Sequence, residues 1–120
     1  MKKQGFETRV LHTSYEREDV YGALAMPVYN TAAYEFETAE AMEAAFFCRT
    51  ADHAYSRITN PTVQHFENCI RSVTGALGVT ALNSGMAAIS NALITVAYAG
   101  SNVVTSSHLF GNTYSFLKNT

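Results

Sequence analysis

A stretch of 46 residues, from Ser72 to Leu117, contains no Asp, Glu, Lys or Arg, whereas all ten acids and seven of the eight Lys and Arg residues lie within residues 1–71. An uncharged stretch of this length is typical either of a membrane segment or of a deeply buried part of a domain. A membrane-spanning helix needs about 18–20 consecutive apolar residues, and polar residues interrupt every apolar run here, at 83–84, 90–91 and 100–102. Parallel sheets covered on both faces consist of short apolar strands. The stretch therefore predicts the interior of an α/β domain, buried more deeply than 120 residues alone can achieve, and so a piece of a larger protein or half of a tight oligomer.

Charge and composition exclude several classes of protein. A formal net charge of −2 gives no basis for binding nucleic acid or an acidic membrane surface. With 48% hydrophobic and 15% charged residues, the chain is neither disordered nor a coiled coil. The two cysteines lack the spacing of a disulfide framework or metal clip, and the four histidines are too dispersed to predict a metal site. Because no apolar run of the secretory type follows Met1, we expect a cytoplasmic protein.

Helix signals are strongest after an Asn-Pro pair. Asn60 is a good N-cap, and Pro61 suits the first helical position because its missing N–H would have no partner there. Apolar residues then recur at helical spacing until Gly75, namely Val63, Phe66, Ile70 and Val73. A shorter helix is predicted over residues 38–47, which are rich in helix formers and carry acids near their start. Residues 1–30 have no sustained period, so we expect an extended arm with little structure of its own.

The second half of the chain alternates between strand and helix signals. Short apolar runs at 78–82 and 102–106 predict buried strands, and the Ala-rich run over 84–98, capped by Gly100, predicts a buried helix between them. A further helix is expected from Gly111 onward. Strand, helix and strand within about 30 residues form a βαβ unit, which implies a parallel sheet. The predicted fold class is therefore α/β.

The turn after the first predicted strand is a candidate anion site. In parallel sheets ligands bind beyond the carboxyl ends of the strands, often at a helix N-terminus. Ser84, Gly85 and Met86 occupy this turn, where the free N–H groups at about Gly85 and Met86 would point at an anion. Gly85 has no Cβ to block a phosphate. A turn without any ligand is an equal alternative. Walker and dinucleotide-binding patterns are absent, because no lysine occurs between residues 4 and 117 and only Gly85 follows the strand closely.

Two other segments carry residues suited to ligand binding. In an extended segment Tyr55 and Arg57 would share a face and present a phenol and a guanidinium to one phosphate. An exposed loop with an ordinary arginine is the alternative. Phe110 follows the second predicted strand, where an aromatic ring can stack on a flat ligand, although such a residue is more often part of the core.

These features, in this order, resemble the N-terminal portion of the Cys/Met-metabolism family of pyridoxal-phosphate enzymes. That family includes cystathionine γ-synthase, cystathionine and methionine lyases and O-acetylhomoserine sulfhydrylase. The resemblance covers nearly all 120 residues and is carried by Tyr-Ser-Arg-x-x-Asn-Pro-Thr at 55–62, by Ser-Gly-Met-Ala at 84–87, and by the aromatic, Gly, x, Thr-Tyr pattern at 110–114. It implies a type I pyridoxal-phosphate transferase fold. Residues 1–60 would form an N-terminal arm with a short helix and dimer contacts, and residues 61–120 the beginning of the cofactor-binding large domain.

The resemblance also implies roles for individual residues. Gly85 and Met86, in the turn that begins with Ser84, would donate backbone N–H bonds to the phosphate of pyridoxal 5′-phosphate. Tyr55 and Arg57 would reach the phosphate bound by a neighbouring subunit, so that a homodimer or homotetramer shares its active sites. Phe110 would stack on the pyridine ring. Many relatives have Tyr at this position, and Phe cannot transfer protons as a tyrosine hydroxyl can.

The segment His108–Tyr114, with Asn83 before Ser84, is most similar to the sulfhydrylase branch. This similarity implies a small amino-acid substrate, O-acetylhomoserine, whose acetate is replaced by sulfide or methanethiol to give homocysteine or methionine. A methionine or cystathionine γ-lyase, or a γ-synthase of the same family, is the alternative. The family chemistry needs a Schiff-base lysine and an acid at the pyridine nitrogen. Neither is expected among these residues, so a third hypothesis is a truncated, non-catalytic α/β fragment, and we expect no catalytic residue within this chain.

Overall fold

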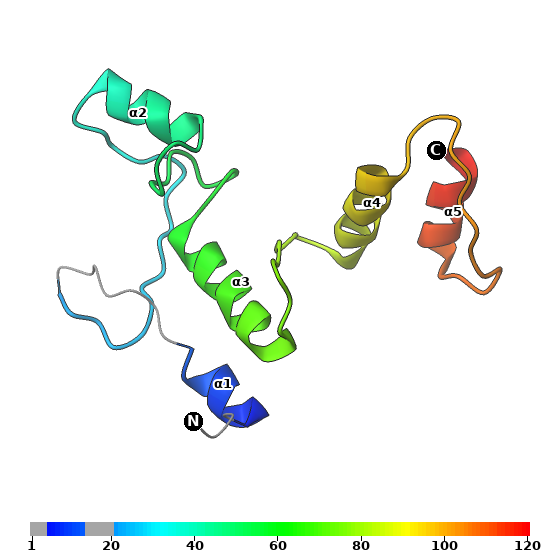
Figure 1. Cartoon of the computed structure of the whole chain (residues 1–120), viewed down its shortest axis with the longest axis horizontal. Coiled ribbons are helices and arrows are strands. Elements are labelled where there is room, and N and C mark those ends of the chain that lie inside the picture. Colours follow the sequence, from blue (N-terminus) through cyan, green and yellow to red (C-terminus); the bar gives the residue numbers. More distant parts are fainter. Residues whose placement is uncertain (1–4, 14–20) are drawn as a thin grey trace. The chain divides into compact units, whose positions relative to one another are not determined.

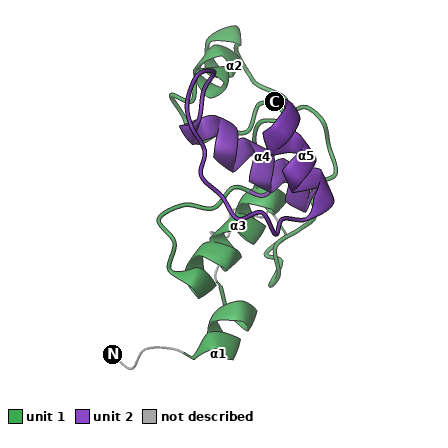
Figure 2. Cartoon of the chain, turned by 90° about the vertical axis from the view of Figure 1, so that its right-hand side faces the viewer, with its two compact units in different colours: residues 1–80 green, residues 81–120 purple. Residues whose placement is uncertain are grey.

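The chain has two compact units, residues 1–80 and residues 81–120, in a computed structural model that describes residues 5–13 and 21–120 (Figures 1 and 2). The first unit contains α1 (Phe6–Leu11), α2 (Ala39–Phe46) and α3 (Pro61–Thr74), and the second contains α4 (Gly85–Val96) and α5 (Gly111–Asn119). The division expected at residue 60 concerns the intact protein and stays a prediction.

Helix α3 begins and ends where the sequence predicts. The Asn60 side chain accepts hydrogen bonds from the N–H groups of Thr62 and Val63, and Pro61 is the first helical residue. At the other end Gly75 has φ 74°, the left-handed conformation that favours glycine after a helix. Helix α2 is likewise confirmed, since the Thr38 hydroxyl caps it by accepting from the Ala41 N–H at 3.1 Å.

Helix α1 corrects the expectation that the arm has little structure of its own. It is only six residues long, too short to produce a periodic signal and too short to be stable alone. A tertiary contact holds it: Arg9 Nη1 donates a 2.7 Å hydrogen bond to the Ser72 carbonyl oxygen in the last turn of α3. A cation is favourable there because the carbonyl groups of a helix end lack partners and carry partial negative charge.

The second unit differs from expectation at the end of its first helix. Helix α4 ends at Val96 instead of Tyr98, and Ala97 is already extended, with φ −120° and ψ 141°. Gly100 (φ 89°) therefore lies in a separate turn and does not cap the helix. The Ser101 hydroxyl stabilises this turn, because it accepts from the Tyr98 N–H and also donates to the Tyr98 carbonyl. This local partner competes with continuation of the helix.

The predicted strands at 78–82 and 102–106 are not formed as strands, and the described part of the chain has one isolated antiparallel bridge, between Ala33 and Tyr55. A strand exists only beside a hydrogen-bonded neighbour. Neither segment is paired with a second strand in the part of the chain that the structure describes. The parallel sheet therefore stays a prediction, although the helix expected between the two segments is present as α4.

Apolar side chains remain largely uncovered. Among the described residues only Ala45, Ala54 and Asn60 are buried, whereas Leu77 and Val104 are 102% and 98% exposed. These two residues lie in the uncharged stretch 72–117. The apolar side chains of this stretch need more protein to cover them than 120 residues supply. The expectation that 120 residues cannot bury this stretch is confirmed. No helix within residues 5–13 and 21–120 has the length and apolarity needed to cross a membrane.

Candidate cofactor site

Tyr55 and Arg57 lie side by side, but in a turn and not in the extended segment that we expected. The N–H groups of Ile58 and Thr59 both bond the Tyr55 carbonyl, at 2.9 and 3.0 Å, which closes residues 55–59 into a turn. The Arg57 guanidinium carbon lies 4.9 Å from the Tyr55 ring centroid. The two side chains therefore lie together as predicted, with the guanidinium over the ring, while their joint binding of a phosphate stays a prediction. Arg57 is exposed and Tyr55 half-buried, so the cation is available to an anion.

The turn is attached to the arm by backbone contacts. Tyr55 forms the antiparallel bridge with Ala33, and the Ser56 N–H donates to the Ala32 carbonyl at 2.9 Å. Immediately after the turn, Asn60 has the β-region conformation expected before a proline, with φ −145° and ψ 135°. The turn therefore lies between two fixed points, the arm at 31–34 and the start of α3.

The first turn of α4 presents unpaired N–H groups. The Ser84 hydroxyl accepts from the Ala87 N–H at 3.1 Å, and the Ser84 carbonyl accepts from Ala88. The N–H groups of Gly85 and Met86 precede these bonds and have no acceptor among the described residues. A Cβ added to Gly85 would meet no atom within 4 Å, so the approach to both groups is open. The geometry suits a phosphate, whose oxygens accept such bonds at a helix N-terminus.

Phe110 occupies the N-cap position of α5, with an extended backbone (φ −61°, ψ 140°) and no side-chain cap bond. Phe110 is 79% exposed. Phe110 is therefore not a core residue in the single chain. The ring is free to cover a flat ligand, and this stacking role stays a prediction.

The predicted site residues fall into two groups. Tyr55 and Arg57 meet in the unit of residues 1–80, whereas Ser84, Gly85, Met86 and Phe110 belong to the unit of residues 81–120. Sequence reasoning treated Asn60 only as a helix cap and did not single out Ser56. Both form hydrogen bonds that join the turn to the arm in the first unit. The sequence offered a sign of this role, because both residues lie within the motif at 55–62.

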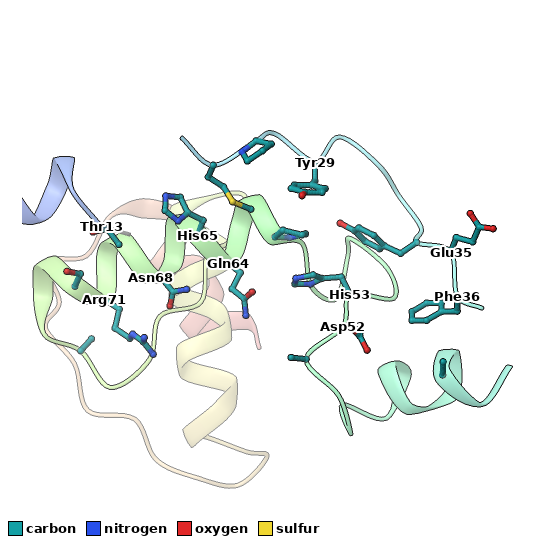
Figure 3. Close-up of a pocket in the computed structure, with 18 of the residues that line it drawn as sticks. Thr13, Tyr29, Glu35, Phe36, Asp52, His53, Gln64, His65, Asn68 and Arg71 are labelled. Carbon is teal, nitrogen blue, oxygen red and sulfur yellow. The ribbon is translucent and has the colours of Figure 1, made fainter. Parts of the chain in front are cut away.

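A groove in the first unit runs between the arm and one face of α3 (Figure 3). His65, Asn68 and Arg71 line it from the helix, and Glu35 and His53 line it from the loops. None of these residues was predicted as functional. Within residues 5–13 and 21–120 no cluster of His, Cys, Asp or Glu could hold a metal ion.

His53 is the residue of this groove with a perturbed pKa. Its ring centroid lies 5.8 Å from that of Tyr34, and its Nδ1 is buried with no hydrogen-bond partner in the described part of the chain. Burial lowers the pKa of His53 below its usual 6.5, and the charge of Asp52 offsets part of this effect. The folded protein therefore favours the neutral ring.

We expect His53 to make folding stability depend on pH. Because the pKa of His53 is lower in the folded than in the unfolded protein, the unfolded chain binds more protons between those two values. Stability should therefore fall as the pH drops from 6.5 through the lowered pKa. Urea unfolding midpoints of the intact protein across this range measure the effect. His53→Gln should flatten the profile, and His12→Gln, at an exposed position, is the matched control. An unchanged profile in His53→Gln would contradict this prediction.

Comparison with known proteins identifies the family. The model of the Cys/Met metabolism PLP-dependent enzyme family matches residues 7–120. The chain therefore belongs to this family, whose enzymes depend on pyridoxal 5′-phosphate (PLP).

Individual relatives include enzymes of two activities. The chain is 42% identical to an L-methionine gamma-lyase of Pseudomonas putida over 97% of its own length and 29% of that protein. It is 39% identical to an O-acetyl-L-homoserine sulfhydrylase of Corynebacterium glutamicum over 91% of its own length and 25% of that protein. The chain thus spans between a quarter and a third of the length of these relatives.

A solved structure shares the fold. A crystal structure from Campylobacter jejuni, described as an O-acetylhomoserine (thiol)-lyase, matches with a TM-score of 0.86 at 32% identity. The match covers 98% of this chain and 29% of that one, which contains N′-pyridoxyl-lysine-5′-monophosphate. The chain therefore has the fold of the corresponding part of a PLP-dependent enzyme.

Proposed function

We propose that the intact protein is a PLP-dependent transferase of sulfur amino-acid metabolism that acts on O-acetylhomoserine. A sulfide or methanethiol sulfur would bond to Cγ while acetate leaves, giving homocysteine or methionine. The observation that carries the proposal is the 0.86 TM-score to an O-acetylhomoserine (thiol)-lyase over 98% of the chain.

The residues of the chain fit the cofactor at its phosphate and its ring. The N–H groups of Gly85 and Met86 would donate hydrogen bonds to phosphate oxygens, and the open space beside Gly85 leaves room for those oxygens. Arg57 would add a full positive charge and charge-assisted hydrogen bonds, and Tyr55 a phenolic hydroxyl. Phe110 would cover the pyridine ring. PLP, when bound, supplies the electron sink for chemistry at the substrate carbons.

We propose further that Tyr55 and Arg57 act on the cofactor of a neighbouring subunit in a homodimer or homotetramer. Support comes from the exposure of Arg57, whose guanidinium contacts the Tyr55 ring and is not engaged in an ion pair within the described residues. A positively charged side chain on a surface turn is suited to complete an anion site across an interface.

Replacement is favoured over elimination by the side chain at position 110. Phe110 can stack, but it has no hydroxyl with which to move a proton to or from the substrate. A γ-lyase remains the second candidate, because the chain is 42% identical to a methionine gamma-lyase. The two reactions differ in products: replacement consumes the sulfur nucleophile, whereas elimination releases a 2-oxo acid.

The test supplies the purified intact protein with O-acetylhomoserine and sulfide, and separately with methionine. We expect sulfide consumption and homocysteine formation to match acetate release one for one, with little 2-oxo acid from methionine. The Phe110→Tyr variant restores the hydroxyl without removing the ring, and it should raise 2-oxo acid release relative to replacement. Rapid 2-oxo acid release from methionine, with no sulfide consumed, would establish the lyase instead.

A further inference from the structure

We propose that Asn60 is the positioning residue of the Tyr55–Arg57 phosphate clamp. This inference rests on the proposed function and concerns how the clamp is held in place. Asn60 has no contact with either clamp side chain among its hydrogen bonds, so any effect on cofactor binding must pass through the turn at 55–59.

Asn60 is a buried polar residue in a structure with little burial, at 7% exposure. Its amide joins three elements. Oδ1 accepts from the Thr62 and Val63 N–H groups at 2.9 and 3.4 Å, which caps α3. Nδ2 lies within hydrogen-bond distance of the Tyr29 carbonyl (3.0 Å), the Tyr34 hydroxyl (3.2 Å) and Ser56 Oγ (2.9 Å). Only an amide supplies an acceptor to the helix and donors to the arm and turn from one short side chain.

Ser56 connects Asn60 to the clamp, because it accepts a hydrogen bond from Asn60 and lies between Tyr55 and Arg57 in the chain. Its hydroxyl accepts from Asn60 and donates to the Thr31 carbonyl, and its N–H bonds the Ala32 carbonyl. The peptide unit between Tyr55 and Ser56, and the Ser56 side chain, are thereby tied to the arm. Ser56 thus restrains the backbone from which the Tyr55 and Arg57 side chains project.

The same end of α3 holds the arm at a second point. The Thr62 hydroxyl accepts from the Tyr29 N–H at 2.8 Å and donates to the Pro27 carbonyl at 3.1 Å. The arm therefore stays attached to α3 when Asn60 is changed, whereas the turn loses the hydrogen bond from Asn60 to Ser56 and is held only by its bonds to the arm. An exposed arginine on a less restrained backbone samples more positions, and ordering it on binding costs conformational entropy. Loss of Asn60 should thus weaken binding at the phosphate specifically.

The test compares PLP with pyridoxal, which lacks the phosphate, as ligands of the intact apoprotein. Asn60→Ser keeps an oxygen that can cap α3 and adds no charge, but its hydroxyl is too short to reach the arm and turn together. We expect the dissociation constant for PLP to rise about tenfold, as for loss of one buried hydrogen bond, with that for pyridoxal changed less than about twofold. Ser56→Ala leaves the cap intact and should show the same selectivity. Thr38→Ala, which removes the cap of α2, is the matched control for loss of stability alone.

The outcomes separate this inference from the function on which it rests. If Asn60→Ser and Ser56→Ala weaken PLP and pyridoxal equally, or weaken neither, Asn60 is only a structural residue and the inference is overturned. If Arg57→Ala, measured alongside, does not change PLP binding, the clamp itself is wrong. Should Asn60→Ser fail to fold, Ser56→Ala alone decides the result, because it leaves the helix cap in place.

Discussion

Replacing Arg57 by alanine in the intact protein should weaken PLP retention about 10- to 100-fold, the range for loss of charge-assisted hydrogen bonds to a phosphate. The reason is local: Arg57 is the cation of the turn at 55–59, and its guanidinium is exposed beside the Tyr55 ring. Equilibrium dialysis or the loss of cofactor absorbance on dilution measures the effect. Arg49→Ala is the matched control, because Arg49 is also exposed and lies 5.1 Å from the centroid of the Phe47 ring.

Mixed dimers test whether Arg57 acts across a subunit interface. An Arg57→Ala subunit combined with a subunit lacking the Schiff-base lysine would give one site that has both groups and one site that lacks both. Because half of randomly formed dimers are mixed and each has one intact site, activity should recover to about a quarter of that of the parent protein. If both variants form mixed dimers and activity does not recover, Arg57 serves its own subunit.

The second large effect concerns residues 1–120 expressed alone, which should self-associate and bind apolar dyes. Leu77 and Val104 are fully exposed, and Val96, Tyr98 and Phe110 are more than three-quarters exposed. Exposed apolar surface on this scale marks an interface or an aggregation risk. Size-exclusion chromatography at micromolar concentration measures the association. The paired change Leu77→Ser and Val104→Ser should reduce the association, whereas Thr38→Ala should not. A monodisperse monomer that unfolds cooperatively would contradict the prediction.

Borohydride reduction of residues 1–120 with PLP should leave no specific lysine adduct.

Local chemistry explains what could be predicted from the sequence. Asn60, Pro61 and Gly75 define α3 through interactions within a few residues, and all three act as their residue types suggest. Helix α1 was missed because its stability comes from the contact of Arg9 with Ser72, far along the chain. The strands at 78–82 and 102–106 were predicted from apolar content, but a strand needs a hydrogen-bonded neighbour, and composition does not say where that neighbour is.

For the candidate site too, local features were predicted and contacts between distant residues were missed. Residue types and spacing indicated that Tyr55 and Arg57 suit a phosphate, and the two side chains do lie together. The reason given, an extended segment, was wrong, because the Tyr55 carbonyl accepts from both Ile58 and Thr59 and closes a turn. The role of Asn60 as a link was hidden, since two of its partners, Tyr29 and Tyr34, lie 31 and 26 residues earlier in the chain. Contacts over such separations leave no periodic trace in a sequence.

The bond from Arg9 to the Ser72 carbonyl also sets an order of events during synthesis. The donor precedes its acceptor by 63 residues, so the nascent chain carries Arg9 without its partner for about 3–13 s at translation rates of roughly 5–20 residues per second. Helix α1 therefore forms late, after α3 has left the ribosome, although it is made first. For those seconds Phe6–Leu11 lacks the contact that stabilises its helix and is open to proteases and to chaperones that bind unfolded segments.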